Sequence, residues 1–143
     1  MKNRLVLMGI SFTLLSVPCY ALDLRVSVKD VKSNDGMIGC GLHSEASTFP
    51  MNPKNESSVK QMWIAAKQSG VECVFENIQP GTYAVAVAHD LNGNKTTDTN
   101  FVGMPTEDWG VSNNIRPSFR APTFDEGKIE VKESQTIEVR VSQ

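Results

Sequence analysis

The chain has 143 residues, of which 40% are hydrophobic, 21% are charged and 7% are aromatic. That length is enough for one domain with its own core. The formal net charge is −2, so the chain lacks the basic excess that contacts with nucleic-acid phosphates require, and nucleic acid is excluded as a partner.

The first 21 residues have the order of a secretory signal peptide. Lys2 and Arg4 precede an uncharged apolar run of 13 residues, "LVLMGISFTLLSV", and the small residue Ala21 follows shortly after. The run is shorter than the ~20 apolar residues that span a bilayer. We therefore expect cleavage after Ala21 and a periplasmic or secreted single domain over residues 22–143, with no membrane insertion afterwards. Loss of Lys2 and Arg4 leaves 12 of the 14 basic residues against 16 acidic ones, a net charge of −4.

Two cysteines remain after cleavage, Cys40 and Cys73. An exported chain with two cysteines usually pairs them, so we expect a disulfide. It would close a loop of 34 residues, which the chain-entropy model values at about 3–4 kcal/mol. Two buried thiols are the alternative, whereas the spacing excludes a CxxC redox pair.

The first half of the domain predicts short strands and one long loop. Residues 22–31 alternate apolar and polar side chains, which is typical of a half-buried strand. A short, glycine-rich strand follows over residues 37–44, and the prolines and small polar residues of 45–58 predict an exposed loop. Residues 59–70 are ambiguous, because some apolar positions have helical spacing. A strand from Trp63 to Lys67 fits the neighbouring elements better.

The second half also predicts strands, over residues 71–78 and 82–90 and, more briefly, over 109–113. We place 82–90 at the centre of a sheet, with Tyr83, Val85 and Val87 in the core. Residues 127–134 and 135–143 are predicted to pair as antiparallel strands, with inward side chains at Ile129, Val131, Ile137, Val139 and Val141. The pattern predicts an all-β fold, an antiparallel β-sandwich of about seven strands of immunoglobulin-like or transthyretin-like type. A small barrel is the competing fold.

Residues 88–110, "AHDLNGNKTTDTNFVGMPTEDWG", form the densest polar run. Oxygen-bearing residues stand there at positions 1, 3, 5, 7 and 9 of a 12-residue calcium loop, the seventh through its backbone carbonyl. These candidate ligands are Asp90, Asn92, Asn94, Thr96 and Asp98. Lys95 stands where such loops have glycine, and Phe101 stands where they have a bidentate Glu. Glu107 or Asp108 could supply that carboxylate from farther along the chain.

The same residues fit a plain turn equally well. Asn92-Gly93 is the preferred pair of a type I′ hairpin, which would place Asp90 opposite Asn94. The sequence leaves the choice between a cation loop and a hairpin open.

Catalytic patterns are weak. His89, Asp90 and Glu107 could form a cluster at the rim of the loop, but adjacent strand residues point to opposite faces. Neither HExxH nor a nucleophile elbow is present. Trp63 and Trp109 could stack on sugar rings, although tryptophans in a domain of this size more often lie in the core.

The stretches "GTYAVAVAHDLNGNKTTDTNFVGMPTEDWGVSNN" and "RPSFRAPTFDEGKIEV" resemble the bacterial family catalogued as domain of unknown function 2141. The resemblance covers residues 71–143 closely and 22–70 by general layout. It implies an exported β-rich domain without an established activity. Lys95 departs from the family pattern, which has glycine there. The matching residues are His89, Asp90, Asn92, Gly93, Asn94, Asp98, Asn100, Gly103, Pro105, Glu107, Gly110, Ser112 and Asn113.

These observations lead to one functional expectation and one alternative. We expect an exported binding or structural module with calcium as its candidate cofactor, acting on an unidentified small molecule or protein partner. The alternative is an enzyme that uses the His89, Asp90 and Glu107 cluster. The lack of a recognisable nucleophile and base favours the binding module.

Overall fold

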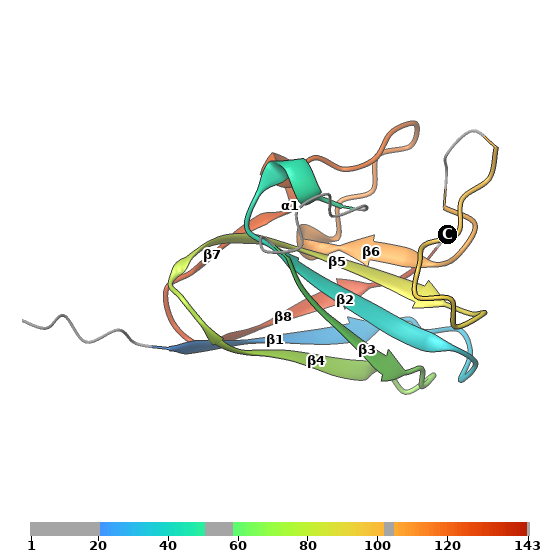
Figure 1. Ribbon diagram of the computed structural model, residues 1–143, viewed down its shortest axis with the longest axis horizontal. Helices are drawn as coiled ribbons and strands as arrows, with labels where there is room; N and C mark the ends of the chain where they lie inside the picture. The colour runs from blue at the N-terminus through green and yellow to red at the C-terminus, as the bar shows by residue number, and fades with distance from the viewer. Residues whose placement is uncertain (1–20, 51–58, 102–104, 143) are drawn as a thin grey trace, which may run out of the picture.

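The computed structural model describes residues 21–50, 59–101 and 105–142. The predicted signal peptide (except Ala21) and much of the predicted 45–58 loop lie outside these ranges. Two β-sheets face each other (Figure 1). Within the described residues no helix is long and apolar enough to span a membrane. The strands are β1 (Leu22–Lys29), β2 (Met37–His43), β3 (Val59–Ala65), β4 (Val71–Ile78), β5 (Gly81–Asp90), β6 (Trp109–Val111), β7 (Lys128–Val131) and β8 (Gln135–Arg140).

The smaller sheet has three strands in the order β4-β1-β8. Its central strand, β1, pairs antiparallel with β4 and parallel with β8. The predicted alternation in β1 is confirmed, because Leu24, Val26 and Val28 are all 0% exposed while Arg25 faces solvent. This parallel pair is a departure from a purely antiparallel sandwich.

The larger sheet has the order β3-β2-β5-β6, and β7 also pairs with β5. The first half of β5 pairs with β7 and the second half with β6, so these two short strands follow one edge of β5. The central position predicted for this strand is confirmed. Val85 and Val87 are 0% and 3% exposed, and Tyr83 packs against the same core.

The predicted antiparallel pairing of the last two strands is wrong. β7 joins β5 in the larger sheet, whereas β8 joins β1 in the smaller one. Both strands still direct Val131 and Val139 into the core between the sheets. Alternation shows which side chains face inward, and it is the same for either choice of sheet.

Residues 59–70 form a strand as expected, but its bounds differ from the prediction. β3 begins at Val59 and ends at Ala65, because it pairs with β2 along the whole length of that strand. Short helical turns among the described residues are η1 (Ala46–Thr48), η3 (Ser112–Asn114) and α1 (Phe124–Gly127). A capping box between Thr123 and Glu126 starts α1.

The predicted disulfide is confirmed. The Cys40 and Cys73 sulfurs are bonded, with Cα atoms 6.6 Å apart. Cys40 belongs to β2 and Cys73 to β4. The bond therefore ties the two sheets together across the core, where both residues are buried.

Candidate functional site

The polar loop starts at Asp90, the last residue of β5. Its side chain is 0% exposed and accepts hydrogen bonds from three successive backbone amides, those of Gly93 (2.8 Å), Asn94 (3.2 Å) and Lys95 (2.6 Å). The chain coils around this carboxylate because three N–H groups must point at one side chain. Asp90 therefore organises the loop from its first residue.

Asp98 binds the amide groups of both loop asparagines. Its Oδ2 accepts from Asn92 Nδ2 at 2.6 Å, and its Oδ1 accepts from Asn94 Nδ2 at 3.0 Å. Asn92 Oδ1 accepts from the backbone amide of Asn94, and Asn94 Oδ1 accepts from the amide and hydroxyl of Thr96. The five predicted cation ligands thus lie in one hydrogen-bonded cluster.

The type I′ hairpin does not form. Such a turn needs positive φ at both Asn92 and Gly93, but only Gly93, at 74°, has it. The second positive φ in the loop is at Lys95, at 61°. This is the position that is glycine in a 12-residue cation loop. Lys95 therefore has the left-handed backbone conformation that glycine adopts more easily.

Glu107 closes the loop from the other side. Its Oε1 accepts from the Leu91 amide at 2.9 Å, and its Oε2 accepts from the Asp98 amide at 3.2 Å. Asp108 instead accepts a hydrogen bond from Lys32 Nζ at 2.7 Å. Of the two carboxylates that could replace the missing twelfth ligand, Glu107 is the one that reaches the loop.

His89 lies apart from these carboxylates. It is 1% exposed, and its Nε2 lies 2.8 Å from the backbone oxygen of Asp35, in the turn before β2. Asp90, the next residue along β5, is bound within the polar loop. His89, Asp90 and Glu107 each bind backbone groups. Among the hydrogen bonds of the described residues, none joins two of these three side chains.

A cleft of about 580 Å³ lies on the outer face of the larger sheet, beside this loop. Its floor consists of small residues at alternate positions of two paired strands, Gly39 and Gly41 on β2 opposite Ala88 and Ala86 on β5. The rings of Trp63 and His43 lie over the two glycines, where a Cβ would come within 2.5 Å of Trp63 and 2.9 Å of His43 Nε2. Ala86 and Ala88 remain partly exposed and form the open part of the floor. The floor therefore results from strand register and side-chain size.

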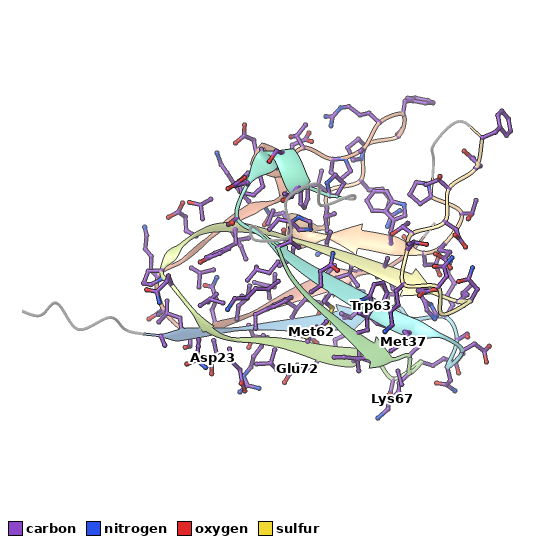
Figure 2. The ribbon with its side chains drawn as sticks, in the orientation of Figure 1. Asp23, Met37, Met62, Trp63, Lys67 and Glu72 are labelled. Atoms are coloured by element: carbon purple, nitrogen blue, oxygen red, sulfur yellow. A yellow bond between two sulfur atoms is a disulfide. The ribbon has the colours of Figure 1, made fainter. Side chains whose placement is uncertain are left out.

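The two tryptophans of the chain form the side walls, and neither belongs to the core. Trp63 on β3 and Trp109 on β6 end a cross-strand row whose middle members are Gly39 and Ala88. Trp63 bends over the row, since a Cβ on Gly39 would lie 2.5 Å from its ring. Figure 2 labels Trp63 on β3 beside Met62, which packs against the core instead. Arg116 stacks on the Trp109 ring at 4.4 Å.

Two loops complete the cleft. The loop after β5 and the one after η3 both rise above the larger sheet (Figure 1, yellow-orange and orange-red). The first contributes threonines and Lys95, and the second contributes Arg120, Ala121 and Pro122. No acidic residue is found among the described residues that line the cleft, although acidic residues outnumber basic ones in the chain as a whole.

His43 lies at the end of the cleft nearest η1. It is 2% exposed, with the Phe49 ring packed edge-on at 5.4 Å. Its Nδ1 lies 3.1 Å from Thr48 Oγ1. That hydroxyl donates its only hydrogen to the Glu45 carbonyl at 2.9 Å, so it can only accept from the imidazole. Nδ1 therefore carries the proton, and Nε2 carries the lone pair.

Burial lowers the pKa of His43 to about 4 from 6.5, with a hydrogen bond to Thr48 opposing part of the shift. In this pH interval the unfolded chain binds a proton that the folded chain does not, so stability falls as the pH falls. We expect a loss of about 2 kcal/mol from this group alone between about pH 6.5 and pH 4.5.

Urea unfolding of the wild type and of His43→Phe at the two pH values measures this loss. Phe retains the edge-on ring contact but cannot titrate, so the variant should lose less stability on acidification. Equal losses in the two proteins would contradict the buried neutral imidazole.

Sequence reasoning identified the polar loop but missed the cleft and His43. One signal was present: Gly39, Gly41, Ala86 and Ala88 place small residues at every second position of two predicted strands. Such a pattern predicts a hollow on one sheet face, provided that the two strands are neighbours in register.

Fold and site together define a disulfide-linked β-sandwich whose carboxylate-organised loop borders an aromatic-walled cleft. The chain belongs to a family described as uncharacterized proteins conserved in bacteria, domain of unknown function 2141, whose model matches residues 26–138. The resemblance expected from the sequence is thus confirmed. No curated protein and no solved structure matches the chain significantly.

Proposed function

We propose that this protein is an exported binding module that takes a small ring-bearing molecule into the cleft on the outer face of the larger sheet. The observation that carries the proposal is the row Trp63–Gly39–Ala88–Trp109. The Trp63 ring covers Gly39, and the partly exposed Ala88 lies between it and Trp109. This arrangement suits a ring, because the ring faces can pack against indoles and displace water. Export is supported by the N-terminal signal pattern and the disulfide.

The charge of the cleft limits which ring-bearing molecules it can bind. Lys95 and Arg120 line it, and the described lining residues include no carboxylate. Arg120 is paired with Glu126 through two bonds of 2.7 and 2.8 Å. Lys95 has no ion-pair partner among the described residues, so it contributes most of the local positive charge. Neutral or anionic rings therefore fit the cleft, and cationic rings do not.

Binding can be tested by NMR, because the two indole N–H signals report on the two walls directly. We expect millimolar methyl β-D-glucopyranoside or 4-methylphenol to shift both signals. Ala86→Leu should abolish the shifts by filling the floor. Thr82→Leu is the matched control, since Thr82 lies on the same strand but not among the residues lining the cleft. Unchanged indole signals with every ring probe would refute the binding function.

Calcium binding by the polar loop is a second proposal, carried by the buried Asp90 with its three amide bonds. The described residues include no cluster of three or more His, Cys, Asp or Glu side chains placed to hold a metal ion. An ion would therefore rely on Asp90 and Asp98 together with amide and backbone oxygens. It must also displace the asparagine amides from Asp98, so we propose weak affinity, on the order of 10⁻⁴ to 10⁻³ M.

Calcium should raise the melting temperature, because its ligands converge only in the folded state. At 100 times Kd the gain is about 2.7 kcal/mol, or roughly 5 °C or more for a domain of this size. A calorimetric titration into tens of millimolar Ca²⁺ measures it, with Mg²⁺ expected to do less.

Two variants make this test specific. Asp90→Ala should abolish the calcium shift. Lys95→Gly should enlarge it, because glycine adopts positive φ without strain and the ammonium no longer repels the ion. Identical melting curves in Ca²⁺, Mg²⁺ and chelator would leave the loop as a purely hydrogen-bonded structure.

A further inference from the structure

We propose that the ligand of the cleft is a hydroxylated ring, and that His43 selects it by accepting a hydrogen bond from a ring hydroxyl at Nε2. This inference rests on the proposed binding function. It adds the chemical class of the ligand and the residue that recognises the ligand. It is carried by a ring nitrogen of a histidine that is 2% exposed and lines the cleft.

The placement of Nε2 follows from two contacts. His43 lines the cleft, and a Cβ built on Gly41 in the floor would lie 2.9 Å from Nε2. The other ring nitrogen, Nδ1, is held by Thr48 Oγ1 at 3.1 Å. Nε2 has no hydrogen-bond partner among the described residues, so it can serve as an acceptor for an occupant of the cleft.

Rigidity makes this acceptor selective. The His43 ring is held edge-on to Phe49, which packs edge-on against Phe124 in turn. The ring cannot rotate to offer a donor instead, because Nδ1–H would then lose Thr48. A ligand atom that fills this end of the cleft without donating a hydrogen bond leaves Nε2 desolvated and unpaired, which costs affinity.

Saccharides and phenols share the required chemistry. Both present a ring face that packs on an indole and a hydroxyl that can donate in the plane of the ring. The structure supports this shared chemistry, and the two sources are separated by the experiment.

The experiment compares ring probes that differ in one donor, using the indole N–H signals as the readout. One arm pairs 4-methylphenol with 4-fluorotoluene, which has similar size and no donor. The other arm pairs methyl β-D-glucopyranoside with its singly deoxyfluoro analogues. We expect the hydroxylated member of one pair to bind roughly three- to tenfold more tightly than its analogue. The arm that shows this preference identifies the source.

His43→Phe should remove the preference while leaving the affinity for the fluorinated analogue within about twofold, because only the acceptor is lost. Thr48→Val is a milder second variant, which frees the tautomer and should reduce the preference. In the wild type the preference should be constant between about pH 5.5 and pH 8, where Nε2 stays unprotonated.

Three results would overturn the inference: equal affinity within both probe pairs, a preference that survives His43→Phe, or a preference that appears only on acidification. If rings bind without any hydroxyl preference, the proposed binding function is supported and the proposed role of His43 as a hydrogen-bond acceptor is contradicted. If no ring probe moves the indole signals, the binding function falls first.

Discussion

Val85→Asp should unfold the domain at ordinary temperature. Val85 is 0% exposed in the central strand β5, opposite Leu42 of β2, and faces the core between the two sheets. A carboxylate there loses its hydration and has no cation to pair with. We expect a loss of about 4 kcal/mol or more, which is a large part of the stability of a typical domain. Circular dichroism at 25 °C would show the loss directly.

Ala86→Asp is the matched control, one residue farther along the same strand. Ala86 faces the cleft, where its side chain is partly exposed. The same charge placed there stays hydrated, so the variant should remain folded with a melting temperature close to that of the wild type. It should also fail to bind ring probes. A folded Val85→Asp variant would mean that Val85 does not face the core and that the inner and outer faces of β5 are wrongly assigned.

Removal of the disulfide should cost about 3–4 kcal/mol, the value of the chain-entropy model for a loop of this length. The bond joins β2 to β4, and these strands belong to different sheets. Without it, the unfolded chain regains the freedom of the intervening segment, while the folded state loses its covalent link across the core. Urea unfolding of the Cys40→Ala/Cys73→Ala double variant against the oxidised wild type measures the difference.

The reduced wild type provides the control for this variant. It keeps both sulfur atoms in the core, so it separates the loss of the crosslink from the loss of packing. The free energies of unfolding of the reduced wild type and the double variant should be closer to each other than either is to that of the oxidised wild type. If reduction leaves the urea midpoint unchanged, the crosslink does not stabilise the domain.

The carboxylates of the polar loop show how far the sequence could predict a site. The spacing of Asp90, Asn92, Asn94 and Asp98 left a cation loop and a hairpin open. In the structure Asn92 and Asn94 both donate to Asp98, whereas Asp90 accepts from backbone amides. The spacing could not show that Glu107 returns to bind the Leu91 and Asp98 amides. That contact depends on the path of the chain after Phe101, for which no local rule exists.

The sequence alone determined most of the strands, though not the bounds of β3, together with the central place of β5 and the disulfide. Alternation with period two is a local property, because each residue's face follows from that of its neighbour. Cysteine count and the export signal were enough to predict the Cys40–Cys73 pair.

Only the tertiary structure decided which neighbours each strand has and what each face of the strand packs against. It assigned β7 and β8 to different sheets, placed both tryptophans outside the core, and aligned Gly39 with Ala88 to make a floor. It also buried His43, which lowers its pKa, and placed Thr48 of η1 against Nδ1. These features depend on which strands become neighbours and in what register. Such long-range pairing is settled by the packing of the whole chain, since every local pattern is compatible with several partners.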